Sequence, residues 1–148
     1  MHVAFYGSLM QGKPPHFGAQ ANIPIQGKME YLGPCTLAGF LYDLGEFPGL
    51  VETHIEREPK PVVQAELYEI LDADALAILD AYEGFFPEAP EASFYLREWI
   101  PLEHQANTKS GTEPINAWCY FYNESIEGKQ LIKSGCWRTH VMNKNDKP

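Results

Sequence analysis

The alternation of hydrophobic and polar residues along the chain predicts mainly short β-strands. Short apolar and aromatic runs are separated by glycine, proline and charged residues, a pattern typical of strands joined by turns. The predicted strands span residues 2–6, 62–70, 94–104 and 115–122. Residues 29–43 are predicted to form strand pieces, because Gly33-Pro34 and Gly39 interrupt the apolar run.

Other segments carry the signals of loops and weaker structure. Residues 7–28 are predicted to form loops, since they include several prolines. Between residues 43 and 52, Pro48-Gly49 suits the inner positions of a type II turn. A weak helix is predicted to begin near Glu127, and the polar residues 143–148 are expected to form a flexible tail.

Residues 73–83 have the strongest helical pattern in the chain. Asp72 is placed to cap the N-terminus of this helix, and Asp74 lies in the first turn, where a negative charge is favoured. Gly84 suits the position that ends a helix. We therefore predict a helix that begins near residue 73 and ends at residue 83.

Glu83 falls on the apolar face of this predicted helix. At about 100° per residue, Glu83 projects between Leu76 and Leu79, which point toward the core. Burial and the C-terminal end of a helix both disfavour a carboxylate, so both raise its pKa toward the range useful for proton transfer near neutral pH. In the alternative interpretation, the helix ends earlier and Glu83 faces solvent.

The pattern as a whole predicts one α+β domain over residues 1–148. We expect a small mixed, mostly antiparallel sheet flanked by helices, and sheets of this kind often curl into a barrel. The 148 residues are enough to bury a substantial core, and 45% of them are hydrophobic.

Charge and cysteine content narrow the classes of partner and compartment. The net charge of −9 disfavours binding to nucleic acid or to an anionic membrane surface. No apolar stretch approaches the length of a membrane span, and no signal peptide is apparent. The three cysteines, Cys35, Cys119 and Cys136, are odd in number and form no C-x-x-C motif, which argues against a disulfide framework. We expect a cytoplasmic protein that is a monomer or a weak homodimer.

The segment after the first strand imitates a phosphate-binding loop. Residues 7–13 fit G-x-x-x-x-G-K, but a P-loop also needs a Ser or Thr hydroxyl after the lysine and a helix N-terminus. Pro14-Pro15 follows Lys13 instead, and it supplies no hydroxyl and no backbone donor. A nucleotide site is therefore disfavoured.

The sequence of the same loop is also compatible with an anion-binding turn. Successive backbone N–H groups of Gly7, Ser8 and Leu9 could point into one concavity and bind an anion or a developing oxyanion. An ordinary turn from strand to loop is the alternative interpretation.

Several short motifs follow one another in a recognisable order. They are YGSL (6–9), GKPPH (12–16), GFLYDLGEFPGLV (39–51), VVQAELYEI (62–70) and LDAYEGF (79–85), with weaker matches at YLR (95–97), AWCYFY (117–122) and GCW (135–137). Together they resemble the γ-glutamylcyclotransferase-like, or AIG2-like, family. The G-x-P-x-H continuation is similar to members close to γ-glutamylamine cyclotransferase. Ala65 replaces a glycine that is usual in the family, and His16 matches a family position without an evident role.

The resemblance implies a small mixed α/β barrel and an intramolecular aminolysis. The α-amine of a small γ-glutamyl compound attacks its own side-chain amide, giving 5-oxoproline and a free amine, with neither metal nor cofactor. Glu83 matches the catalytic glutamate, and Tyr6, Gly7, Ser8 and Leu9 match the substrate-binding loop.

Two further points stay open on the sequence. Tyr95 and Tyr122 are candidates for the wall of the pocket, with packing in the core as the alternative. A non-enzymatic member that binds a small metabolite or another protein is the alternative to an enzyme. Removal of a γ-glutamyl group from a larger carrier is a third interpretation, since loops such as residues 86–93 and 105–114 are expected to recognise the released amine.

Overall fold

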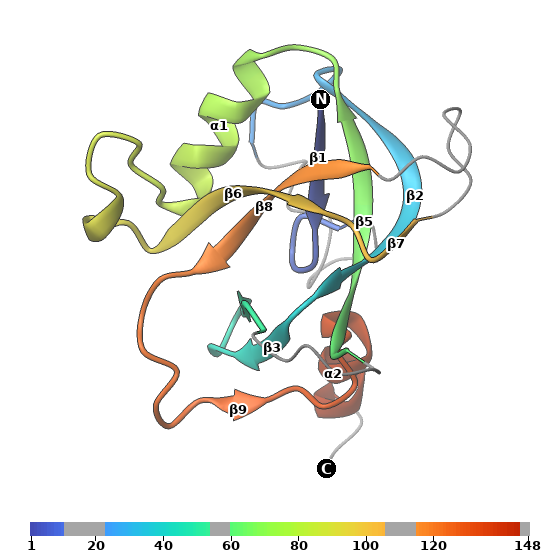
Figure 1. The fold of residues 1–148 in the computed structure, drawn as a ribbon, viewed down its shortest axis with the longest axis vertical. Coiled ribbons are helices and arrows are strands. Elements are labelled where there is room, and N and C mark those ends of the chain that lie inside the picture. The colour runs from blue at the N-terminus through green and yellow to red at the C-terminus, as the bar shows by residue number, and fades with distance from the viewer. Residues whose placement is uncertain (11–22, 54–59, 106–114, 146–148) are drawn as a thin grey trace.

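The computed structural model describes residues 1–10, 23–53, 60–105 and 115–145 (Figure 1). Within these ranges the strands are β1 (His2–Phe5), β2 (Met29–Ala38), β3 (Phe40–Asp43), β4 (Pro48–Val51), β5 (Val62–Ile70), β6 (Tyr95–Pro101), β7 (His104–Gln105), β8 (Asn116–Tyr122) and β9 (Gln130–Leu131). The helices are α1 (Asp74–Glu83), the short 3₁₀ helix η2 (Pro90–Ala92) and α2 (Trp137–Asn145). No helix in the described ranges is long and apolar enough to cross a membrane.

The strands form two sheets, of which the larger has the order β6-β8-β1-β5-β2-β7 and the smaller β4-β3-β9. Their pairings are antiparallel except for the parallel pair β1–β8, which confirms the mostly antiparallel prediction. β5 has the predicted bounds, because its alternating Val63, Ala65 and Leu67 are buried in the core. α1 and α2 lie at opposite ends of the view in Figure 1.

The larger sheet curls strongly, but no closed barrel is observed. Its two edge strands, β6 and β7, are joined by residues 102–103 alone. The amide of Leu102 donates to the carbonyl of Ile115, and that of Glu103 donates to the carbonyl of Thr36 on β2. The described residues show no ladder between β6 and β7, so the mixed, mostly antiparallel sheet is confirmed but a closed barrel is not shown.

The chain breaks at Gly39 as predicted, but not at Gly33-Pro34. β2 continues through Gly33-Pro34 with an irregularity in its pairing between Tyr31 and Gly33. Gly39 has a φ of 149°, and a Cβ there would lie 2.6 Å from the carbonyl oxygen of Val51. Only glycine is comfortable in that position, where the chain leaves the larger sheet for the smaller one.

Pro48 and Gly49 belong to β4, so the predicted turn is misplaced. The chain reverses over residues 44–47, where the amide of Leu44 donates to the carbonyl of Phe47 over 3.0 Å. Proline is tolerated as the first residue of a strand, because the missing N–H costs nothing there. A Cβ on Gly49 would lie 2.9 Å from the Cβ of Tyr122, so glycine allows β4 to approach β8 closely.

The C-terminal region differs most from the predictions. No helix begins at Glu127, where the chain turns, and α2 begins at Trp137 instead. Residues 143–145 belong to α2, so a tail can begin only after them. The only buried side chains of α2 are Trp137 and Val141, one turn apart, which is a weak signal in an otherwise polar segment.

Candidate active site

A cleft of about 910 Å³ opens where the end of β1, the end of α1, the β3–β4 turn and α2 meet. Its lining residues lie in segments 4–9, 45–48 and 81–84, with Phe94, Tyr95, Tyr120, Trp137, Val141 and Lys144. This volume is at the upper end of the range for small-molecule sites. The cleft brings together Glu83 and the loop Tyr6 to Leu9, which are far apart in the sequence.

Glu83 is the last residue of α1, and the end of the helix is well defined. Gly84 adopts the left-handed conformation with a φ of 69°, as the sequence predicts. The amide of Gly84 donates to the carbonyl of Ala81, and the amide of Phe85 donates to that of Asp80 over 2.9 Å. These two bonds form a Schellman motif, so the helix does not end before Glu83.

The side chain of Glu83 lies in the cleft wall, partly buried. Burial raises the pKa of its carboxyl group from 4.5 to about 8. The end of the helix acts in the same direction, because a negative charge is disfavoured there. A carboxyl group with such a pKa can accept and return a proton near neutral pH.

Tyr6, the first residue of the loop, is fixed to β8 and β4 through its hydroxyl group. Its hydroxyl donates to the carbonyl of Tyr120 over 2.6 Å and accepts from the amide of Leu50 over 3.2 Å. The side chain is 6% exposed, and burial raises the pKa of this phenol. Tyr6 therefore ties β8 to β4, while part of the residue still lines the cleft.

The next three residues bring the loop against its neighbours. A Cβ on Gly7 would lie 2.9 Å from Cγ of Pro48, so glycine permits a close approach of the loop to β4. The hydroxyls of Ser8 and Tyr82 share a hydrogen bond of 3.1 Å, which fastens the loop to the last turn of α1. Leu9 is buried and also lines the cleft.

The two tyrosines predicted as candidates for the pocket wall lie in different positions relative to the cleft. Tyr95 lines the cleft, and its hydroxyl donates to the carbonyl of Pro48 over 2.7 Å. Tyr122 is not among the lining residues. Its ring packs against those of Tyr95 and Phe94, at 5.9 and 5.5 Å between centroids, so it supports the wall from behind.

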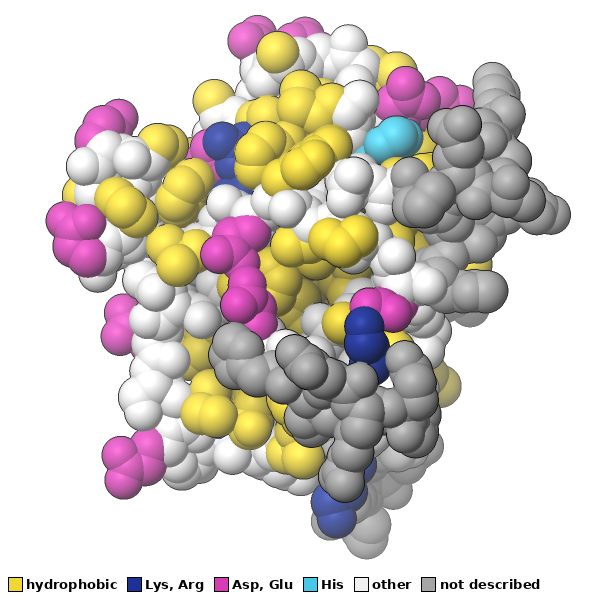
Figure 2. Space-filling model, in the orientation of Figure 1, with side chains coloured by type: hydrophobic (Ala, Val, Ile, Leu, Met, Phe, Trp, Pro, Cys, Tyr) yellow, Lys and Arg dark blue, Asp and Glu magenta, His cyan; other side chains and the backbone are white. Residues whose placement is uncertain are grey.

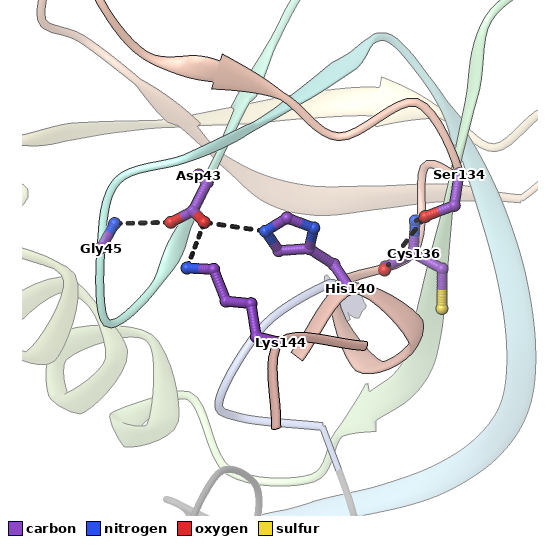
Figure 3. A network of polar contacts seen from close by, with 6 residues as sticks. All are labelled: Asp43, Gly45, Ser134, Cys136, His140 and Lys144. Atoms are coloured by element: carbon purple, nitrogen blue, oxygen red, sulfur yellow. Dashed lines mark hydrogen bonds and ion pairs between the residues drawn. The ribbon is translucent and has the colours of Figure 1, made fainter. Parts of the chain in front are cut away.

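A network that the sequence did not reveal fastens α2 to the cleft (Figure 3). The carboxylate of Asp43 accepts hydrogen bonds from the amide of Gly45 and from Nε2 of His140, each over 2.7 Å, and also contacts Nζ of Lys144. Burial acts to raise the pKa of Asp43, but the hydrogen bonds from Lys144, His140 and Gly45 hold it below its ordinary value. The available signals were Asp-x-Gly, typical of a turn, and the one-turn spacing of His140 and Lys144.

A second group of polar contacts includes Arg97, for which the sequence favours a structural or exposed ion pair over pairing with a substrate carboxylate. The hydroxyl of Tyr120 donates to Oδ1 of Asp80 over 2.7 Å, and Nε of Arg97 lies 3.4 Å from the same oxygen. The guanidinium of Arg97 also stacks over the ring of Trp118, at 4.5 Å. Asp80 precedes Glu83 by one helical turn, so this group holds the end of α1 against β6 and β8.

The structure does not describe residues 11–22, and the questions raised by that segment fall outside it. They concern Gly12-Lys13, the proline pair that follows, and His16.

The fold and the cleft define a class of protein: a small mixed α+β domain with a partly buried carboxyl group, that of Glu83, in the wall of a cleft of small-molecule size. The sequence model of the gamma-glutamyl cyclotransferase, AIG2-like family matches residues 3–139. The chain belongs to this family.

Individual relatives agree with this assignment. A protein of Vibrio cholerae serotype O1, named as a candidate gamma-glutamylcyclotransferase, is 32% identical over 95% of this chain and 98% of its own. The solution structure of YtfP from Escherichia coli, a gamma-glutamylcyclotransferase family protein, has a TM-score of 0.61 at 29% identity, covering 95% of this chain and 99% of that one. A mouse AIG2-like protein shares the fold with a TM-score of 0.59 at 20% identity, covering 85% and 80% of the two chains.

Proposed function

We propose that this protein is a γ-glutamyl cyclotransferase that converts a small γ-glutamyl amine or γ-glutamyl amino acid into 5-oxoproline and a free amine. The observation that carries the proposal is the carboxyl group of Glu83, partly buried in the cleft with its pKa raised to about 8. Family membership supports the same reaction class.

One carboxyl group accounts for both proton transfers in this reaction. The ionised carboxylate of Glu83 takes a proton from the substrate α-ammonium group, and the free amine attacks the γ-carbonyl carbon. The new C–N bond closes a five-membered ring and gives a tetrahedral intermediate. Glu83 then returns the proton to the leaving nitrogen as the original amide C–N bond breaks. The ring nitrogen loses its second proton to solvent, which gives neutral 5-oxoproline and leaves the enzyme in its starting state.

The loop opposite Glu83 is suited to the charged parts of the substrate. The α-carboxylate and the developing oxyanion both need hydrogen-bond donors, which we assign to the backbone N–H groups of Gly7, Ser8 and Leu9. The hydrogen bond between the hydroxyls of Ser8 and Tyr82 holds the loop at a fixed place relative to Glu83. Fixed placement matters because ring closure requires a folded substrate.

The test is to incubate the protein with γ-glutamyl compounds and to measure 5-oxoproline. Glu83→Gln keeps the shape of the side chain but removes the base, so kcat is expected to fall by about 10²- to 10⁴-fold. Glu88→Gln is the matched control, because Glu88 is exposed and lies outside the cleft. A Glu83→Gln protein as active as the wild type would overturn the mechanism. Heat stabilisation by a γ-glutamyl compound without turnover would instead support a binding protein.

A further inference from the structure

The opening of the cleft carries three aromatic side chains that remain largely exposed. Phe47, Tyr82 and Phe94 all line the cleft, and they are 38%, 43% and 40% exposed. We call these three residues the aromatic rim. In Figure 2, hydrophobic side chains also reach the surface over the segment that follows α1, which is consistent with an apolar border on this side. Large apolar groups gathered around one opening are typical of a binding surface.

We propose that the aromatic rim binds the released amine and favours γ-glutamyl amides whose amine carries an aromatic ring. This inference rests on the proposed cyclotransferase function and adds a preference for one class of leaving group.

The rim lies next to the proton donor. Tyr82 immediately precedes Glu83 in α1. The amide of Phe94 donates to the carbonyl of Gly84 over 2.9 Å, which fixes Phe94 beside the end of the helix. Because Glu83 must reach the leaving nitrogen, any group attached to that nitrogen lies within reach of these two rings.

The loop and the aromatic rim differ in exposure, from which we infer the direction of the substrate. Tyr6 and Leu9 are 6% and 3% exposed, and the backbone donors assigned to the glutamyl group belong to the same loop. With the glutamyl group against this loop, the amine faces the more exposed rim.

The rings of the rim are held in place by other aromatic side chains. Phe47 packs edge-on against Phe94, with centroids 5.8 Å apart. Phe94 in turn packs edge-on against Tyr95 and Tyr122, at 5.3 and 5.5 Å. Such pairs favour fixed ring geometries, so a further ring has preformed faces and edges to meet.

The charges lining the cleft do not offer a better partner for the amine. Lys144 is engaged by the carboxylate of Asp43, which is itself buried. Glu46 lies on the exposed turn beside Phe47, where it disfavours a leaving group with a carboxylate. A leaving group that carries an aromatic ring and no carboxylate is not repelled by Glu46 and does not need Lys144 as a partner.

Substrate pairs that differ by one phenyl group provide the test. We would compare kcat/KM for γ-glutamylphenethylamide against γ-glutamylethylamide, and for γ-glutamylphenylalanine against γ-glutamylalanine. Partial burial of a phenyl ring is expected to favour the phenyl member of each pair by about tenfold. Phe47→Ala should bring the ratio of kcat/KM within each pair close to one. Phe94→Leu removes a second aromatic ring of the rim but keeps an apolar side chain, and it should lower the same ratio.

Phe86→Ala is the matched control. Phe86 is 50% exposed and close to α1 in sequence, but it does not line the cleft, so the ratio should stay at the wild-type value. Turnover of all four compounds without a phenyl preference, or a preference that survives Phe47→Ala and Phe94→Leu in folded protein, would overturn the inference and leave the cyclotransferase function standing. Turnover of none of the four would overturn both.

Discussion

Replacing Glu83 with glutamine should stabilise the folded protein at alkaline pH while it abolishes turnover. Burial raises the pKa of Glu83 from 4.5 to about 8, so between these values the folded state keeps a proton that the unfolded chain has released. The stability that this proton confers is complete below pH 4.5 and is lost as the pH rises through about 8. Glutamine resembles the protonated acid and has no proton to lose.

The pKa shift sets the size of the effect. One pKa unit corresponds to about 1.4 kcal/mol, so a change from 4.5 to about 8 gives an upper limit of about 5 kcal/mol in the free energy of unfolding. Glu83 lies in an open cleft and keeps some exposure, so solvent stabilises the carboxylate once it ionises. We therefore expect Glu83→Gln to be about 2–3 kcal/mol more stable than the wild type at pH 9.

Urea unfolding at pH 5, 7 and 9 measures this difference directly. Other groups also titrate in this range, among them Glu98, whose pKa is raised to about 7 by burial and by its hydrogen bond to Glu52. They are common to both proteins, so the informative quantity is the difference between the variant and the wild type. That difference should be small at pH 5 and grow toward pH 9. A difference that stays constant over this range would refute the reasoning, and Glu88→Gln should follow the wild type throughout.

Two further substitutions test the supports of the cleft. Tyr6→Phe leaves two buried backbone groups without their hydroxyl partner and should lower the free energy of unfolding by about 2–4 kcal/mol in urea; unchanged stability would mean that this hydroxyl does not join β4 to β8. Asp43→Asn should loosen α2 and speed proteolysis within residues 137–145. The pKa of Asp43 is lowered in the folded protein, so the wild-type advantage should be present above its ordinary pKa of 3.8 and vanish as the pH falls through the lower folded value. An advantage that persisted in strong acid would contradict this account.

The sequence predicted the elements whose local signals agree with their packing. β5 alternates cleanly and pairs on both sides, so its bounds were predicted correctly. The helix ending at Glu83 was predicted because its apolar stripe and Gly84 point to the same end. The same stripe places Glu83 on the apolar face of the helix, in agreement with its position in the cleft wall, whereas its catalytic role came from the family resemblance and stays a prediction.

The errors arise where long-range packing overrides a local signal. Gly33-Pro34 looks like a break, but pairing with β5 carries β2 through it. Pro48-Gly49 looks like a turn, but the close approach of Gly49 to Tyr122 makes it part of β4. Likewise, Asp43 and His140 are 97 residues apart, and no local pattern connects them.

The hydroxyls around the cleft strengthen the assignment of the proton transfers to Glu83. Those of Tyr6, Tyr95 and Tyr120 each donate to an acceptor within the protein, and burial raises the pKa of all three phenols. A phenol whose hydroxyl already donates a hydrogen bond, and whose pKa is raised, is a poor base. The carboxyl group of Glu83 makes no hydrogen bond among the described residues, and its pKa of about 8 is close to neutrality. These hydroxyls therefore stabilise the fold, and Glu83 remains the group to which we assign the proton transfers.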